Sequence, residues 1–145
     1  MKKEDKKILK EVRKHCVYNM FNDRFHLINV YDPSQQLYVT DNGLGCSSYS
    51  TDIDNAVKEK QKVGMYDIKD ITGLYVGDLV YFKNIFKHNN EYYGVVSNID
   101  FESGVITIHY FTRYGVTYEL VQFNNTGVVI KKARLLSKKT HPYCV

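Results

Sequence analysis

The 145-residue chain has no tryptophan, only two prolines and three cysteines, and no run approaching the roughly 18 apolar residues that a membrane helix requires. The cysteines, Cys16, Cys46 and Cys144, are odd in number and have no paired spacing, so we expect no disulfide framework. His15-Cys16 and the pair His141 and Cys144 lack zinc-finger spacing. The sequence therefore predicts no metal site and no membrane-spanning helix.

Catalytic motifs are also missing. The glycines are scattered, and Gly43-Leu44-Gly45 is not followed by the Lys-Ser/Thr of a phosphate-binding loop. Neither a Gly-x-Ser-x-Gly elbow nor a His-Glu-x-x-His zinc motif occurs. Cys46 could act as a nucleophile with His26 or His109 as its base, but a lone cysteine in a serine-rich loop is more often an unreactive thiol. We predict no enzymatic activity and no cofactor.

The charge is unevenly distributed around a formal net value of +4. Residues 2–14 hold seven bases against three acids, residues 131–139 hold five bases and no acid, and the middle of the chain is net negative. The charged start is followed by further charge rather than by an apolar segment, so we expect no secretory signal and a cytoplasmic, intracellular protein. With 43% hydrophobic residues, the chain has enough apolar surface to fold.

The first part of the chain predicts an α-β-β-α arrangement over residues 1–72. Apolar residues recur every fourth position within 3–20, which favours a helix with a basic outer face. Phe25–Tyr31 and Leu37–Thr40 suggest a hairpin, because Asp32-Pro33-Ser34 has type I turn chemistry. Asp41–Ser50 is expected to be a loop, after which Thr51 would cap a second helix that ends at Gly64.

The second part, residues 73–145, consists of Tyr-rich apolar runs separated by Gly- and Asn-containing turns and ends in a basic tail. Short runs of this kind are typical of a small antiparallel barrel or sandwich. The overall prediction is an α+β fold in which the first part packs on this β-rich part. The expected strands are Asp78–Phe86, Glu91–Phe101, Val105–Phe111, Val116–Phe123 and Val128–Leu136.

The stretch from Gly73 to Phe82, in which Gly77-Asp78 leads into an apolar strand, resembles the opening of SH3-like small barrels such as Tudor and KOW-type modules. The resemblance continues in Tyr93-Gly94-Val95-Val96 and in Gly104–Phe111, and it covers residues 73–136. It implies an SH3-like antiparallel barrel. Fold alone does not specify a ligand, and the cage residues of Tudor modules have no alignable counterparts here.

Alternation along the strands predicts which side chains face the core. We expect Val80, Phe82, Ile106 and Ile108 to point inward, together with Tyr118 and Leu120. Thr117 and Glu119 should then point outward. An aromatic cluster is expected on the outside, although the N-terminal part could instead cover it. This cluster and its basic neighbours form the predicted partner-binding set: Tyr81, His109, Phe111, Arg113, Tyr114, Lys131, Lys132 and Arg134.

These features favour a non-enzymatic interaction protein that binds another macromolecule, with a protein as the favoured partner. The small, Lys-, Asn- and Tyr-rich chain resembles accessory proteins of phages and mobile elements, so inhibition of a host or defence protein, of the anti-CRISPR type, is one specific hypothesis. The alternative is a nucleic-acid-binding module, in which the basic segments 2–14 and 131–139 flank exposed aromatic residues. The sequence does not indicate an oligomeric state.

Overall fold

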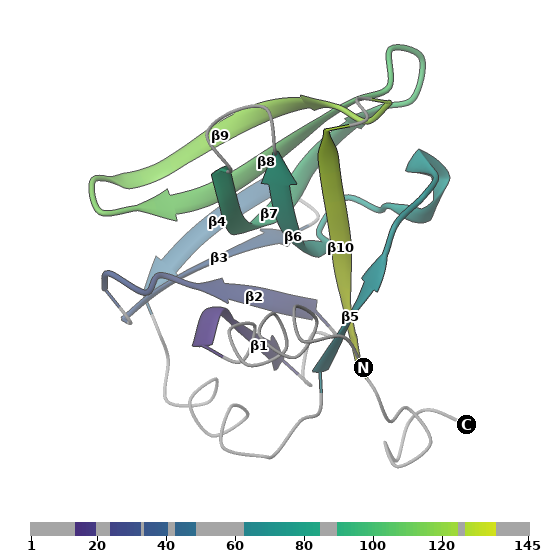
Figure 1. The fold of residues 1–145 in the computed structure, drawn as a ribbon. Helices are drawn as coiled ribbons and strands as arrows, with labels where there is room; N and C mark the ends of the chain where they lie inside the picture. The colour runs from purple at the N-terminus through teal and green to yellow at the C-terminus, as the bar shows by residue number, and fades with distance from the viewer. Residues whose placement is uncertain are drawn as a thin grey trace.

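The computed structural model describes residues 14–19, 24–32, 34–40, 43–48, 63–84, 90–124 and 127–135, which form two antiparallel β-sheets (Figure 1). The first sheet has the order β1-β2-β3-β4 and the second the order β5-β10-β6-β7-β8-β9. In the first sheet the strands are β1 (Cys16–Asn19), β2 (Arg24–Ile28), β3 (Gln35–Thr40) and β4 (Gly43–Ser48). In the second they are β5 (Val63–Asp67), β6 (Leu79–Asn84), β7 (Asn90–Asp100), β8 (Val105–Thr112), β9 (Gly115–Gln122) and β10 (Val128–Leu135).

The predicted α+β class with an N-terminal α-β-β-α part is wrong, because the structure is nearly all β-sheet. The expected helix 3–20 becomes strand at Cys16–Asn19, where Cys16 and Tyr18 are buried at alternate positions and pair with β2. Residues 3–13 of that expected helix lie outside the described residues. Residues 51–62 of the second expected helix lie outside them as well. Where that second helix was expected to end, the chain forms β5 instead.

The hairpin predicted around Asp32 is confirmed as β2 and β3. Asp32 organises the turn: its carboxylate oxygen Oδ1 accepts hydrogen bonds from the backbone N–H and the hydroxyl of Ser34, at 3.2 and 2.6 Å. The following segment was expected to be a loop, yet Gly43–Ser48 pairs along its length with β3. Its glycines and serines have low strand propensity, so tertiary pairing outweighs local preference here.

All five strands predicted in the second part are present as β6 to β10. The meander β6-β7-β8-β9 is followed by β10, which returns to pair with β6, and β5 pairs with the other side of β10. β5 precedes residue 73, so the second sheet contains residues from both sides of the predicted domain boundary at residue 72. That boundary stays a prediction. A short 3-10 helix, η1 (Ile71–Gly73), connects β5 to β6.

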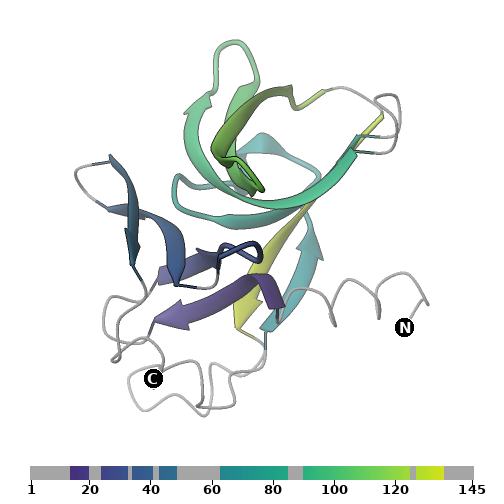
Figure 2. The same cartoon turned by 90° about the vertical axis from the view of Figure 1, so that its left-hand side faces the viewer.

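The second sheet buries residues on both of its faces. Figure 2 shows the meander curled around its inner face, above the first sheet. We call the cluster inside the curl the inner core and the cluster between the two sheets the inter-sheet core. The buried members of the inner core are Leu74, Val80, Phe82, Val96, Ile106, Ile108, Val121 and Ile130. The buried members of the inter-sheet core are Cys16, Leu27, Leu37, Val39, Leu79, Val95 and Ala133.

The close approach of β7 to β8 depends on a glycine. A Cβ atom at Gly94 would lie 2.4 Å from Cγ2 of Ile108 and 2.8 Å from the carbonyl oxygen of His109. We therefore expect Gly94→Ala to lower the free energy of unfolding by about 1–2 kcal/mol, since overpacking displaces backbone. Gly73→Ala is the matched control, because its Cβ would meet Ile68 at 3.7 Å, an ordinary contact. Chemical denaturation of both variants checks this, and equal stabilities would contradict the close approach.

Candidate functional site

Tyr81, predicted to face outward, is buried. It points away from the inner core as alternation requires, but the first sheet lies over that face. The Tyr81 hydroxyl donates a hydrogen bond of 2.6 Å to Oε2 of Glu91, and its ring centroid lies 5.5 Å from that of Tyr93. Tyr81 therefore belongs to the interior, and the expectation of an exposed side chain here is wrong.

Phe111 and His109 on β8 are half-buried. Phe111 packs against the inter-sheet core, so the N-terminal part covers it in part, which the sequence left open as an alternative. His109 Nδ1 lies 2.7 Å from the hydroxyl oxygen of Ser97, and partial burial lowers the pKa of His109. Ser97 in turn donates to the carbonyl oxygen of Thr107 at 3.3 Å. Ser97 on β7 thus contacts both the His109 ring and the carbonyl oxygen of Thr107 on β8, and these contacts tie the two strands together.

Arg113 and Tyr114 form the two-residue tip of the β8–β9 hairpin, and both are exposed. The tip is held by Thr112, whose Oγ1 accepts from the backbone N–H of Tyr114 at 3.2 Å and donates to the carbonyl oxygen of Gly115 at 3.1 Å. Gly115 has φ of +124°, a conformation that favours glycine. Tyr114 is 92% exposed, so the tip presents an aromatic ring on a fixed backbone.

The inward assignment predicted for Tyr118 and Leu120 on β9 is wrong, since these side chains are 60% and 62% exposed. Thr117 and Glu119 face the inner side instead. Glu119 is accommodated there because its carboxylate accepts a hydrogen bond from the Tyr92 hydroxyl. Burial and this carboxylate raise the pKa of Tyr92. A polar group that gains a partner can occupy the inner face, which reverses the parity expected from polarity alone.

Tyr92 also organises the aromatic rings around this carboxylate. Its ring stacks on Tyr110 with centroids 3.9 Å apart and contacts Phe82 at 4.8 Å. Burial, and then the charge of Glu119, raise the pKa of Tyr110. The Tyr92–Glu119 hydrogen bond joins β7 to the inner side of β9, which holds β9 in its orientation.

The reversed parity exposes one row of apolar side chains on β9. We call Val116, Tyr118 and Leu120 the outer strip; Val116 is 41% exposed. The register places Tyr118 opposite His109, with ring centroids 5.5 Å apart, and Leu120 opposite Thr107. β9 is the terminal strand of its sheet and runs along the upper rim of the molecule in Figure 1. The outer strip and Tyr114 thus lie on one hairpin.

The predicted basic residues of β10 are mostly engaged in ion pairs. Lys131 Nζ lies 3.0 Å from Oδ1 of Asp67, and Lys132 Nζ lies 3.1 Å from Oδ2 of Asp78. Arg134 is exposed, with its guanidinium carbon 5.6 Å from the ring centroid of Tyr66. Two of the three cations are therefore neutralised by nearby carboxylates, which weakens the predicted basic surface.

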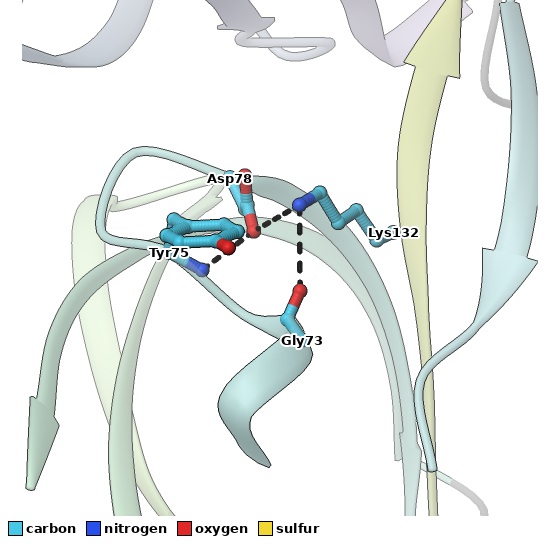
Figure 3. A network of polar contacts seen from close by, with 4 residues as sticks. All are labelled: Gly73, Tyr75, Asp78 and Lys132. Atoms are coloured by element: carbon cyan, nitrogen blue, oxygen red, sulfur yellow. Dashed lines mark hydrogen bonds and ion pairs between the residues drawn. The ribbon is translucent and has the colours of Figure 1, made fainter. Parts of the chain in front are cut away.

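Lys132 is the centre of a network that the sequence analysis missed (Figure 3). Besides Asp78, its ammonium contacts the carbonyl oxygen of Gly73 at 3.4 Å and lies 4.7 Å from the ring centroid of Tyr75. The same Oδ2 of Asp78 accepts the backbone N–H of Tyr75 at 2.7 Å. The network ties the η1–β6 turn to β10. Because 54 positions separate Lys132 from Asp78 in the sequence, no local pattern signals it.

A pocket of about 270 Å³ opens beside β10, lined by Ile68, Lys69, Phe123, Val128 and Ile130. Its one ionisable side chain, the Lys69 ammonium, offers no acid–base pair. Within the part of the chain that the structure describes, no cluster of His, Cys, Asp or Glu could hold a metal ion, and no helix is long and apolar enough to cross a membrane. The pocket alone indicates no reaction.

The catalytic pairing considered for Cys46 gains no support from its proposed bases. His26 is buried, its Nδ1 lies 2.7 Å from Oε1 of Gln36, and its ring stacks on Tyr38. His109 contacts Ser97 as described above, while the Cys46 side chain lies outside the description. Another thiol, Cys16, is buried, which raises its pKa to about 12 and keeps it protonated near neutral pH.

Comparison of the chain with family models, curated proteins and solved structures finds no match.

Proposed function

We propose that this chain is a non-enzymatic protein-binding module whose contact surface is the outer strip and the hairpin tip. The observation that carries the proposal is the row of exposed apolar side chains at Val116, Tyr118 and Leu120, beside the 92% exposed Tyr114. Exposed apolar side chains gathered along one strand are a type of surface that protein partners contact. Tyrosine is enriched among the residues that dominate binding energy.

The backing of the outer strip supports this proposal. β9 pairs with β8 at eight consecutive positions without a register shift, and Val121 anchors it in the inner core. The Tyr92–Glu119 hydrogen bond holds its middle from the inner side. A surface fixed in this way loses little conformational freedom on binding, so more of the contact energy remains as affinity.

Inhibition of a host or defence protein, with the chain encoded by a phage or mobile element, is the specific case that we carry forward from composition. Steric blocking requires a rigid contact surface and no chemistry, and the hairpin supplies such a surface. The SH3-like assignment of residues 73–136 is likewise a proposal, supported by the return of β10 to β6 after the four-stranded meander.

Nucleic-acid binding is the second candidate, favoured by two aromatic rings with adjacent cations. These are Arg134 over Tyr66 and Lys132 over Tyr75, and the two tyrosine residues are 42% and 65% exposed. Against this candidate, Asp67 and Asp78 neutralise Lys131 and Lys132. We therefore expect the described face of β10 to add little to the binding of random DNA or RNA and to its dependence on salt, because few phosphates can be neutralised there.

The proposal predicts that partner binding depends on Tyr118 and not on an equally exposed tyrosine elsewhere. Tyr118→Ala should weaken binding at least about tenfold, since central aromatic residues carry most of the energy of an interface. Tyr31→Ala, in the turn between β2 and β3, is the matched control, because Tyr31 is 58% exposed. The measurement is quantitative capture from extracts of the source cells with wild-type and variant baits, after thermal melting has shown that all three baits are folded.

A protein retained by the wild-type and Tyr31→Ala baits but lost with Tyr118→Ala meets this expectation. Equal retention by all three baits would contradict it. A steep salt dependence of binding to random nucleic acid, unchanged by Tyr118→Ala, would favour the second candidate instead.

A further inference from the structure

The β8–β9 ladder determines in which direction each backbone N–H and C=O group of β9 points. The loop Arg113-Tyr114 joins β8 and β9 directly, so the flanking pair Thr112 and Gly115 is a hydrogen-bonded pair of the ladder. Hydrogen-bonded and non-hydrogen-bonded pairs then alternate along an antiparallel ladder. The odd-numbered residues of β9 therefore direct their N–H and C=O groups toward β8.

One contact beyond the end of β9 agrees with this parity. The N–H of Phe123, an odd-numbered residue, donates to the carbonyl oxygen of Gly104 at 2.8 Å, on the β8 side. Consequently Val116, Tyr118 and Leu120 direct their backbone N–H and C=O groups toward the open edge of the sheet. These are also the residues of the outer strip. Backbone hydrogen-bonding capacity and exposed apolar side chains thus coincide at the same three positions.

Among the described strands, β9 pairs only with β8, and of the features that usually protect an edge it has only an inward-pointing charge, Glu119. Natural edge strands carry lysine, proline or bulges, or are very short. β9 is eight residues long, contains no lysine or proline, and runs without a bulge. Its one charged side chain, Glu119, faces the inner side and accepts a hydrogen bond from the Tyr92 hydroxyl. Such an edge is a template for another strand.

We propose that this edge pairs antiparallel with β9 of a second copy of the chain, centred on Tyr118. A two-fold axis at Tyr118 places the two Tyr118 residues opposite each other and each Val116 opposite Leu120 of the second copy. On the inner side, Thr117 faces Glu119 of the second copy. Aromatic and aliphatic cross-strand pairs of this kind are stabilising, and no like charges are opposed. The edge of both copies is then closed.

Charge selects this register over the alternative with the same overlap. Pairing centred on Glu119 would also let the backbone N–H and C=O groups at the two open edges bond to one another. It would, however, place the two Glu119 carboxylates directly opposite. Cα atoms of such a non-hydrogen-bonded pair are only about 4.5 Å apart, and like charges directly opposite are destabilising. The register centred on Tyr118 avoids this repulsion and keeps seven residues of each strand paired, 115–121.

The dimer would join the two six-stranded sheets and bring both outer strips to one side of the joined sheet. This follows because paired residues of neighbouring strands share a face. The dimer uses the same outer strip as the proposed function, but the chain alone tests it, so either proposal can fail without the other.

Sedimentation velocity of the purified chain between about 1 and 100 µM tests the dimer, a range that covers Kd values of weak to moderate interfaces. The wild type should dimerise. Tyr118→Lys and Tyr118→Glu should each weaken dimerisation at least about tenfold, because the register opposes like charges across the axis. An equimolar mixture of the two variants should restore the dimer. Tyr31→Lys is the control and should dimerise like the wild type.

Amide exchange by NMR provides a second measurement that does not depend on a variant. The amides of Val116, Tyr118 and Leu120 should exchange slowly at high concentration and faster on dilution, while those of Thr117, Glu119 and Val121 stay slow throughout. A monomer at 100 µM overturns the proposal, and so does a dimer that neither charged variant weakens. If the equimolar mixture of Tyr118→Lys and Tyr118→Glu stays monomeric, the register centred on Tyr118 is wrong. Slow exchange of the edge amides in a monomer would place another segment of the same chain on β9.

Discussion

Ile108→Asp is expected to leave the chain unfolded at room temperature. Ile108 is fully buried in the inner core, between β7 and β9. An aspartate there would either bury a charge without a partner or be forced to take up a proton, which costs several kcal/mol. Since domains of this size are stable by only about 5–15 kcal/mol, the loss is comparable to the total. Circular dichroism and thermal melting measure the outcome, and Val80→Asp should behave in the same way.

Leu120→Asp is the matched control for this prediction. It makes a similar change on the adjacent strand, but Leu120 is 62% exposed in the monomer, so at concentrations where the chain is monomeric the carboxylate stays hydrated and the melting temperature should change little. A folded, cooperatively melting Ile108→Asp variant would show that β8 turns the opposite face to the inner core.

Asp78→Ala is expected to produce the second-largest loss of stability. It removes the carboxylate that accepts the Tyr75 N–H and pairs with Lys132, whose side chain is only 12% exposed. Leaving one member of a largely buried pair without its counter-ion costs about 3 kcal/mol, at the lower end of the range for fully buried pairs. Urea denaturation of wild type and variant gives the difference in unfolding free energy.

The neighbouring ion pair provides the control for Asp78→Ala. Lys131 precedes Lys132 on β10 and pairs with Asp67, whose side chain is 59% exposed. Asp67→Ala should therefore cost no more than about 1 kcal/mol, because solvent screens an exposed pair. Equal losses for the two variants would show that the Lys132 network does not secure the η1–β6 turn.

The strands of the second part could be predicted because local signals agree there. Apolar runs end at glycine- or asparagine-containing turns, and at Val80, Phe82, Ile106 and Ile108 the apolar side chains face the core as alternation requires. The same reasoning failed on β9, where Glu119 has its partner, Tyr92, 27 positions away in the sequence. A polar residue that finds a distant partner inverts the parity inferred from polarity, and this inversion exposes the outer strip.

The first part could not be predicted in the same way. Spacing of apolar residues by four positions suggested a helix through Cys16, yet pairing with β2 makes this segment a strand. β4 consists of residues with weak strand preference and forms through its register with β3. Tyr81 illustrates the consequence for the candidate site. Its orientation away from the inner core follows from alternation, but only the first sheet determines that this second face is covered.

Photo-crosslinking from the hairpin tip most directly tests the claim that the β8–β9 hairpin is the partner-binding surface. The photoreactive residue p-benzoylphenylalanine is placed at Tyr114, which is 92% exposed, or at Tyr31, which is 58% exposed, and irradiated with the captured partner. We expect a crosslinked species of chain plus partner from position 114 and none from position 31. A crosslink to the partner from position 31 with none from position 114 would contradict it.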